Sequence, residues 1–150
     1  MIGWIKMTIS ELYQNAKAID LADIFSDVIE KNEQHLIDLN HNQLQFGLDS
    51  EGNYLREYQS PAYALEKQSM NPKAGLGNPD LKYTGAFYRG WSLLITNSEF
   101  LFDSGDSKTS DLIEKYGQNI FGLRKENIES FTVDIFTNDF FTELNNQLAK

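Results

Sequence analysis

The N-terminal part of the chain carries apolar residues at helical spacing. Thr8 or Ser10 is suited to cap a short first helix, because a hydroxyl there accepts a hydrogen bond from a free backbone N–H. Asp20 is placed to cap a longer helix that runs to about residue 40. The first stretch has Ile9, Leu12, Tyr13 and Ala16 on one side. In the second, helical spacing of the apolar residues predicts that one face of the longer helix is buried; these residues are Leu21, Ile24, Phe25, Val28, Leu36 and Leu39. The pattern leaves open whether these are two helices or one kinked helix.

Two stretches alternate apolar and polar residues around a turn, which is typical of β-hairpins. The first spans residues 44–55, and Gly52 supplies the positive φ that a type I turn with a bulge needs. The second has apolar runs at residues 92–95 and 100–102, on either side of a turn at residues 96–99. Together they predict a small antiparallel sheet.

A long helix is predicted over residues 125–148. Its apolar positions are Ile128, Phe131, Ile135, Phe136, Phe140, Leu144 and Leu148. This surface is larger than one face of a small sheet needs. Two interpretations stay open: a wide core face, or a face that packs on another subunit. For the second interpretation the candidate subunit interface consists of Phe136, Phe140, Phe141 and Leu144.

Segments rich in glycine and aromatic residues lie on both sides of the second predicted hairpin. Thr84 is predicted to cap a short helix, while Gly85 lets the backbone pass closely. Another short helix over residues 110–116 is expected to end at Gly117 in a left-handed cap. The residues of the predicted fold motifs are Gly52, Thr84, Gly85, Phe87, Trp91, Tyr116, Gly117, Gly122 and Leu123.

Proline and glycine punctuate residues 59–80, which predicts a mobile loop with one or two helical turns within residues 62–70. Residues 1–7 are expected to form a flexible arm. The whole pattern predicts a single α+β domain over residues 1–150. In it, a small antiparallel sheet of two hairpins is packed by a long N-terminal helix and a long C-terminal helix.

Composition narrows the classes of function. The chain has 150 residues, a formal net charge of −9 and a sequence pI of about 4.6. Such an acidic chain gains nothing from counterion release, so direct readout of nucleic acid is not expected, whereas contact with a basic patch on a partner protein stays open. The lack of cysteine excludes disulfides, thiolate metal sites and a cysteine nucleophile. No run approaches the roughly 18 apolar residues of a membrane span, and the N-terminus lacks the apolar core of a signal peptide.

No residue pattern points to catalysis, a cofactor or a metal. His35 and His41 are six residues apart on a predicted helix, a spacing that does not bring them together, so both are expected at the surface. A calcium loop beginning at Asp49 fails because Ser60 occupies the position of the bidentate glutamate. The prediction is therefore a non-enzymatic protein without cofactors.

Three segments carry a resemblance to a known family. They read F-G-L-D-S-E-G-N-Y-L at residues 46–55, G-N-P-D-L-K-Y-T-G-A-F-Y-R-G-W at residues 77–91, and E-K-Y-G-Q-N-I-F-G-L-R-K-E-N-I at residues 114–128. In these segments the chain resembles tail-completion or head–tail joining proteins of tailed phages, of the type common in Bacteroidetes phages. It departs from that pattern at Gly90, where serine is usual, and at Arg124, where a capping threonine or serine is common.

The resemblance implies a structural protein of the virion, made in the host cytoplasm, with no catalytic role. Its partners would be copies of itself in a ring and the neighbouring proteins of the neck: the portal or connector, and the tail terminator or tube. Closed rings use head-to-tail contacts between identical subunits.

Two other functions are compatible with the residues. An acidic inhibitor or immunity-type protein would bind a basic partner through charge complementarity, and a concentrated acidic face would favour it. Dispersed charge with apolar stripes would favour the ring instead. A small enzyme built on carboxylates would require a deep pocket with two close acidic groups, which no spacing in the sequence predicts.

Overall fold

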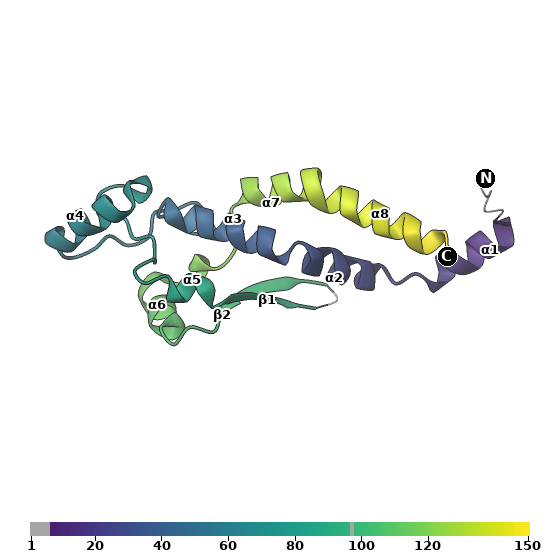
Figure 1. Ribbon diagram of the computed structural model, residues 1–150, viewed down its shortest axis with the longest axis horizontal. Coiled ribbons are helices and arrows are strands. Elements are labelled where there is room, and N and C mark those ends of the chain that lie inside the picture. Colours follow the sequence, from purple (N-terminus) through teal and green to yellow (C-terminus); the bar gives the residue numbers. More distant parts are fainter. Residues whose placement is uncertain (1–6, 97) are drawn as a thin grey trace.

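The computed structural model describes residues 7–96 and 98–150 and has an α+β fold of elongated shape (Figure 1). Helices α2 (Leu21–Lys31) and α3 (Glu33–Gln45) run along the middle of the molecule. Helix α8 (Thr137–Leu148) lies along one side of α2. The hairpin of β1 (Trp91–Ile95) and β2 (Phe100–Ser104) lies on the other side. Helices α2 and α3 are thus covered on two sides, which explains why they carry many of the most buried side chains.

The N-terminal stretch forms separate helices, which settles the question that the sequence left open. In α1 (Ile9–Ala18), Thr8 and Glu11 form a reciprocal capping box, and the Asp20 carboxylate caps α2 as predicted. The predicted long helix divides at Asn32, whose side-chain amide donates to the Val28 carbonyl and to Asp139 of α8. The division at Asn32 is therefore tied to the packing of α8.

The core lies where α3, the hairpin and the first turns of the C-terminal helix meet. Its buried members are Ile29, Leu36, Ile37, Leu44, Leu55, Phe87, Tyr88, Trp91, Leu93, Ile120, Leu123 and Phe131. Ile24, Val28 and Leu36 are buried as the helical spacing predicted, whereas Leu21 is 57% exposed. Leu21 is the first residue of α2, and the part of the molecule around it contributes little to the core.

One of the two predicted hairpins forms a sheet. Strands β1 and β2 pair antiparallel, with Trp91 opposite Ser104 and Ile95 opposite Phe100. The prediction of a hairpin over residues 44–55 was wrong, because α3 continues to Gln45 and takes Leu44 into its buried face. What remains is a tight turn closed by a single bridge between Leu48 and Tyr54.

The C-terminal helix covers the predicted range but is not a uniform α-helix. It consists of α7 (Lys125–Phe131), a π-helical segment (Thr132–Phe136) and α8. The wide turns of a π-helix accommodate a five-residue step in the apolar pattern, from Phe131 to Phe136. These two rings lie 6.3 Å apart between centroids, and Phe136 stacks in turn on Phe140 at 5.6 Å. The π segment thus keeps the aromatic side chains on one face.

The proline- and glycine-rich stretch contains more structure than the sequence indicated. Helix α4 (Pro61–Met70) occupies its first half and a 3₁₀ turn follows at Pro72–Ala74. Pro79 and Asp80 are buried, which holds the end of the predicted mobile loop against the body of the protein. The predicted flexible arm lies almost wholly outside the described residues, which begin at Met7.

Gly90 sits where two segments pass too closely for a side chain. A Cβ atom there would meet the Ser104 hydroxyl oxygen at 2.8 Å and the Asp106 backbone nitrogen at 2.9 Å. We expect Gly90→Ala to lower the free energy of unfolding by about 1–3 kcal/mol, because one of the clashing atoms is backbone and cannot move alone. Urea denaturation measures this.

Gly105→Ala is the matched control for that substitution. A Cβ at Gly105 would have only the Gly90 carbonyl nearby, at 3.9 Å, so its effect should stay within about 0.5 kcal/mol, as is usual for surface changes. Equal effects at both glycines would contradict the steric argument.

Candidate interaction surfaces

The predicted motif residues of the central region hold the fold together. Gly85, with φ of +82°, is the N-cap of α5 (Ala86–Arg89), and the Thr84 hydroxyl accepts from the Ala86 N–H at 3.3 Å. Phe87 and Trp91 are both buried, with ring centroids 5.6 Å apart. These side chains face the core and are not available to a partner.

The second motif follows α6 (Thr109–Tyr116) and is fixed from α3. Gly117 ends α6 as predicted, but its φ of +90° and ψ of 165° differ from the left-handed helical cap that was expected. Gly122 also has a positive φ, and Leu123 is buried. Two side-chain amides of α3, from Asn40 and Gln43, hydrogen-bond the backbone of residues 120–124. Sequence reasoning missed these polar core residues because it followed only apolar positions.

The predicted subunit interface is partly a packing face. Phe136 contacts Phe25 of α2, and Phe140 and Leu144 are half-buried, whereas Phe141 is 56% exposed. Neither α1 nor α8 contributes a fully buried residue. The four candidates therefore do not form one free surface, and Phe141 alone is clearly exposed.

Helix α1 presents apolar side chains that its own chain does not cover. Ile9 is 88% exposed, Tyr13 58% and Leu12 44%. The helix projects at one end of the molecule (Figure 1), and its tie to α8 includes the hydrogen bond from Asn15 to the Leu148 carbonyl, 3.1 Å long. A capped helix with an uncovered apolar face is a candidate contact surface.

A second uncovered apolar surface lies on the outer face of the hairpin. Leu94 and Leu101 are cross-strand neighbours, and each has more than half of its surface exposed. A groove runs from them to Ile128 of α7, which is 50% exposed. This groove is separate from α1, so the molecule offers apolar contact area at two places.

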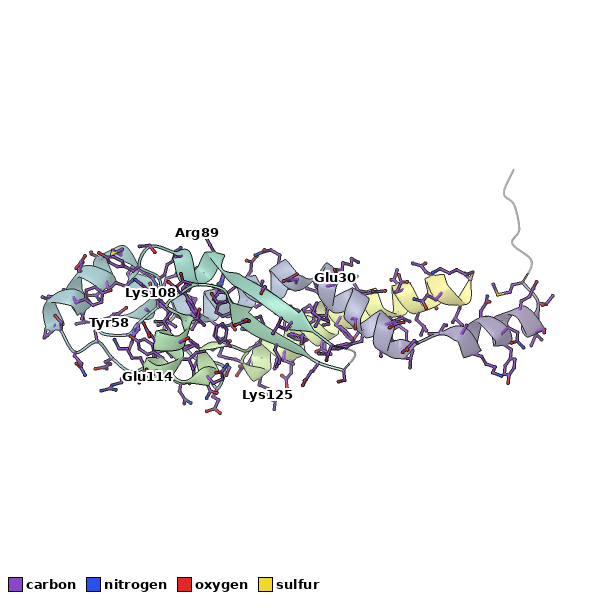
Figure 2. All side chains as sticks on the ribbon, turned by 90° about the horizontal axis from the view of Figure 1, so that it is seen from below. Glu30, Tyr58, Arg89, Lys108, Glu114 and Lys125 are labelled. Carbon is purple, nitrogen blue, oxygen red and sulfur yellow. The ribbon has the colours of Figure 1, made fainter. Side chains whose placement is uncertain are left out.

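A pocket at the other end of the molecule combines tyrosine and lysine. We call it the tyrosine–lysine pocket; its defining residues are Tyr58, Tyr63, Tyr83, Tyr116, Lys82, Lys108 and Lys115. Its volume is about 250 Å³, and Leu81, Phe87 and Leu112 add apolar lining. Figure 2 shows Tyr58 and Lys108 at this end of the elongated molecule. Such a volume suits one side chain better than a large ligand.

A buried ion pair lies beside the pocket and helps to hold its lining in place. Lys67 Nζ lies 2.8 Å from Asp80 Oδ1, and both side chains are about 5% exposed or less. The Asp80 carboxylate also accepts from the Asn71 amide at 2.9 Å and from the Lys82 N–H at 3.0 Å. Lys67 also donates to the Lys82 carbonyl. Between them Leu81 adopts a left-handed φ of +56°, a conformation that needs such support in a residue other than glycine.

Two tyrosines of this region, Tyr58 and Tyr63, stay protonated at neutral pH. Burial, with the Asp80 carboxylate adding to it, raises the pKa of Tyr58 above its ordinary range. Burial raises the pKa of Tyr63 as well. Each hydroxyl can therefore both donate and accept a hydrogen bond at neutral pH.

No protein-family model, curated protein or solved structure matches this chain.

Within residues 7–96 and 98–150, no group of three or more His, Asp or Glu side chains is placed to hold a metal ion. Among the same residues, none of the helices has the length and apolar character to cross a lipid bilayer.

The charge of the chain is distributed unevenly. Residues 56–124, which include the tyrosine–lysine pocket, hold eight Lys or Arg and eight Asp or Glu. The residues outside this range, which include α1 to α3 and α7 to α8, hold five basic and fourteen acidic side chains. The net charge of −9 therefore comes from residues outside 56–124 and not from the part of the chain that forms the pocket.

His41 is not the surface residue that the sequence predicted. Its ring stacks on Tyr88 at 4.3 Å and contacts Trp91 edge-on at 4.7 Å. Burial lowers the pKa of His41; the Asp38 carboxylate opposes this shift and the Lys82 ammonium adds to it. His35 is exposed, as expected.

The lowered pKa of His41 makes the fold sensitive to mild acid. Below the ordinary histidine pKa of about 6.5 the unfolded chain takes up a proton that the folded chain resists, so stability falls with falling pH until the folded pKa is reached. Between pH 7 and 5, wild-type protein should lose more unfolding free energy than His41→Gln. Urea titrations at both pH values measure the difference, and equal losses would show that His41 is not desolvated.

Proposed function

We propose that this protein is a non-enzymatic structural subunit of a tailed-phage virion, working at the neck or tail-completion position as part of a homo-oligomeric ring. In this role it would contact copies of itself and the neighbouring neck proteins, the portal or connector on one side and the tail terminator or tube on the other. The proposal rests on the family resemblance of residues 46–55, 77–91 and 114–128, and it requires no catalytic group.

The observation that carries the proposal is the uncovered apolar face of α1. A ten-residue helix with a complete capping box exposes Ile9, Leu12 and Tyr13 at helical spacing. Exposed apolar side chains of this kind are costly for a monomer in water and typical of a surface that a partner covers. The exposed leucines of the hairpin, Leu94 and Leu101, provide a second face, and a neck subunit with a different neighbour on each side uses two.

The decisive test is mass spectrometry of purified virions from the phage or induced prophage that encodes this chain. We expect the protein in the particle at a few to tens of copies. Its absence from virions, together with abundance in the infected cell, would overturn the proposal.

An acidic inhibitor or immunity-type protein is the second candidate, and one specific observation favours it. Asp23, Asp27 and Glu30 lie on one exposed face of α2, so the acidic charge is concentrated and not dispersed. Such a face suits a basic partner protein. Affinity capture from infected cells separates the two candidates: a basic nuclease or toxin as the main partner would favour the inhibitor, and virion proteins would favour the ring.

A further inference from the structure

The lysines of the tyrosine–lysine pocket have no acidic partner within the described part of the chain. The ion pairs among the described residues join Lys31 to Asp139, Lys67 to Asp80, and Lys125 to Glu129. Lys82, Lys108 and Lys115 take part in none of them, and all three are exposed. The rim of the pocket is therefore a cationic surface on an acidic protein.

Tyrosine side chains make this surface suited to protein contact. Tyr83 is 62% exposed, and Tyr58, Tyr63 and Tyr116 are half-buried. Tyrosine offers a large rigid ring and a hydroxyl group at low entropic cost, which is why it is enriched in protein-binding surfaces. Lysines around it would select an acidic partner.

Helix α2 carries an acidic stripe that matches this chemistry. Asp20, Asp23, Asp27 and Glu30 follow one another at steps of three and four residues, so they share one face of the helix. All four are exposed. We call these residues the α2 acidic stripe.

The two surfaces cannot meet within one copy of the chain. Helix α2 lies toward the end of the molecule that carries α1, whereas α4 and α6, which line the pocket, lie at the opposite end (Figure 1). In Figure 2, Glu30 is well separated along the long axis from Tyr58 and Lys108. Their complementary charges can be satisfied only between molecules.

We propose that the tyrosine–lysine pocket binds the α2 acidic stripe of a second copy of this chain and joins copies head to tail. This inference rests on the proposed function and names the contact that would build the ring. The contact uses two different surfaces of one protein. A copy whose pocket is occupied therefore still has its stripe available to the next copy, which produces a ring or a filament and not a closed dimer.

A nucleic-acid phosphate backbone is the other polyanion that lysines and tyrosines can bind. The charge of the whole chain favours a protein segment, because a net charge of −9 repels an extended polyanion while a local stripe of carboxylates can be paired with three lysines.

The test is a charge exchange followed by sedimentation velocity. Variant A carries Lys108→Glu and Lys115→Glu, and variant B carries Asp23→Lys and Asp27→Lys. Each change is at an exposed side chain, so the fold should be kept, which circular dichroism checks. We expect self-association to weaken by about tenfold or more in each variant, because like charges then face each other.

Mixing the two variants distinguishes a head-to-tail contact from any other. The intact stripe of variant A fits the intact pocket of variant B, and the reversed charges of the two altered surfaces also attract each other, so the mixture should recover assemblies that neither variant forms alone. A chain that carries all four substitutions should again form the wild-type assemblies. Lys125→Glu with Glu126→Lys is the matched control, because both residues are exposed and lie outside the two surfaces, and it should behave as wild type.

Three results would overturn the inference. Unchanged self-association of variants A and B would place the contact elsewhere. A monomeric wild type would exclude a second copy as the occupant. Binding of single-stranded DNA that is lost in variant A but kept in variant B would identify the pocket as a phosphate site. None of these results decides whether the protein is in the virion, so the proposed function stands or falls separately, on mass spectrometry of virions.

Discussion

Replacing Asp80 by asparagine should lower the free energy of unfolding by about 3–5 kcal/mol, the usual cost of removing one partner of a buried ion pair. The substitution keeps the shape of the side chain but leaves the Lys67 ammonium, which is 5% exposed, without its counter-charge. Desolvation of an unpaired charge is the dominant cost. Urea denaturation at neutral pH measures the loss.

Two further variants isolate the charge. Lys67→Met together with Asp80→Asn removes both charges, so this pair should recover much of the loss. Lys125→Ala removes a surface partner of Glu129, with 86% and 63% of the two side chains exposed, and should cost no more than about 0.5 kcal/mol. A cost below about 1 kcal/mol for Asp80→Asn would contradict the burial of the ion pair, because it would mean that water reaches the two charges.

Replacing Asn40 by alanine should cost about 2–4 kcal/mol. Its side chain is fully buried, accepts from the Gly122 N–H at 2.7 Å and donates to the Ile120 carbonyl at 3.2 Å. Alanine leaves both backbone groups buried without a partner, at about 1–3 kcal/mol each, and part of that cost is recovered if the segment moves toward water.

Hydrogen exchange gives this prediction a local readout. The Gly122 amide should lose protection in Asn40→Ala more than amides of the hairpin do. Asn42→Ala is the control on the same helix, because Asn42 is exposed and its replacement should change stability by no more than about 0.5 kcal/mol. If the two asparagines had equal effects, the buried amide would not be what holds residues 120–122.

The elements that the sequence predicted well are those whose signal is local. Ile24, Val28 and Leu36 follow helical spacing and are buried, and the hairpin of residues 91–104 follows from its two apolar runs and the turn between them. Leu44 shows the limit of local patterns. It fits a strand and a helix equally, and packing on the face of α3 decided for the helix.

Features that depend on distant partners were not predictable. Asn40 and Gly122 are 82 residues apart, and neither local sequence predicts the hydrogen bond between them. A hydropathy pattern likewise predicts that Lys67 and Asp80 are exposed to solvent, whereas both are buried as an ion pair. The π-helical segment left no such signal, since Ile135 follows Phe131 at the four-residue step of an ordinary α-helix.

The candidate site was predicted less completely than the fold. Phe141 is exposed, so partner contact there stays a prediction, whereas Phe136 packs on Phe25 within the chain. The tyrosine–lysine pocket draws on residues from 58 to 116, and only the fold brings them together.

The arrangement of the chain ends has a mechanical consequence. Met7 and Lys150 line the same small surface pocket, and the Asn15 side chain bonds the Leu148 carbonyl beside them. A force that separates the two ends would therefore load the contacts one after another, beginning with α1 against α8, and would not shear them all at once. The molecule should open like a zipper from this tip at low force, while the buried ion pair and the Asn40 bonds, far along the chain from either end, would be the last to feel the load.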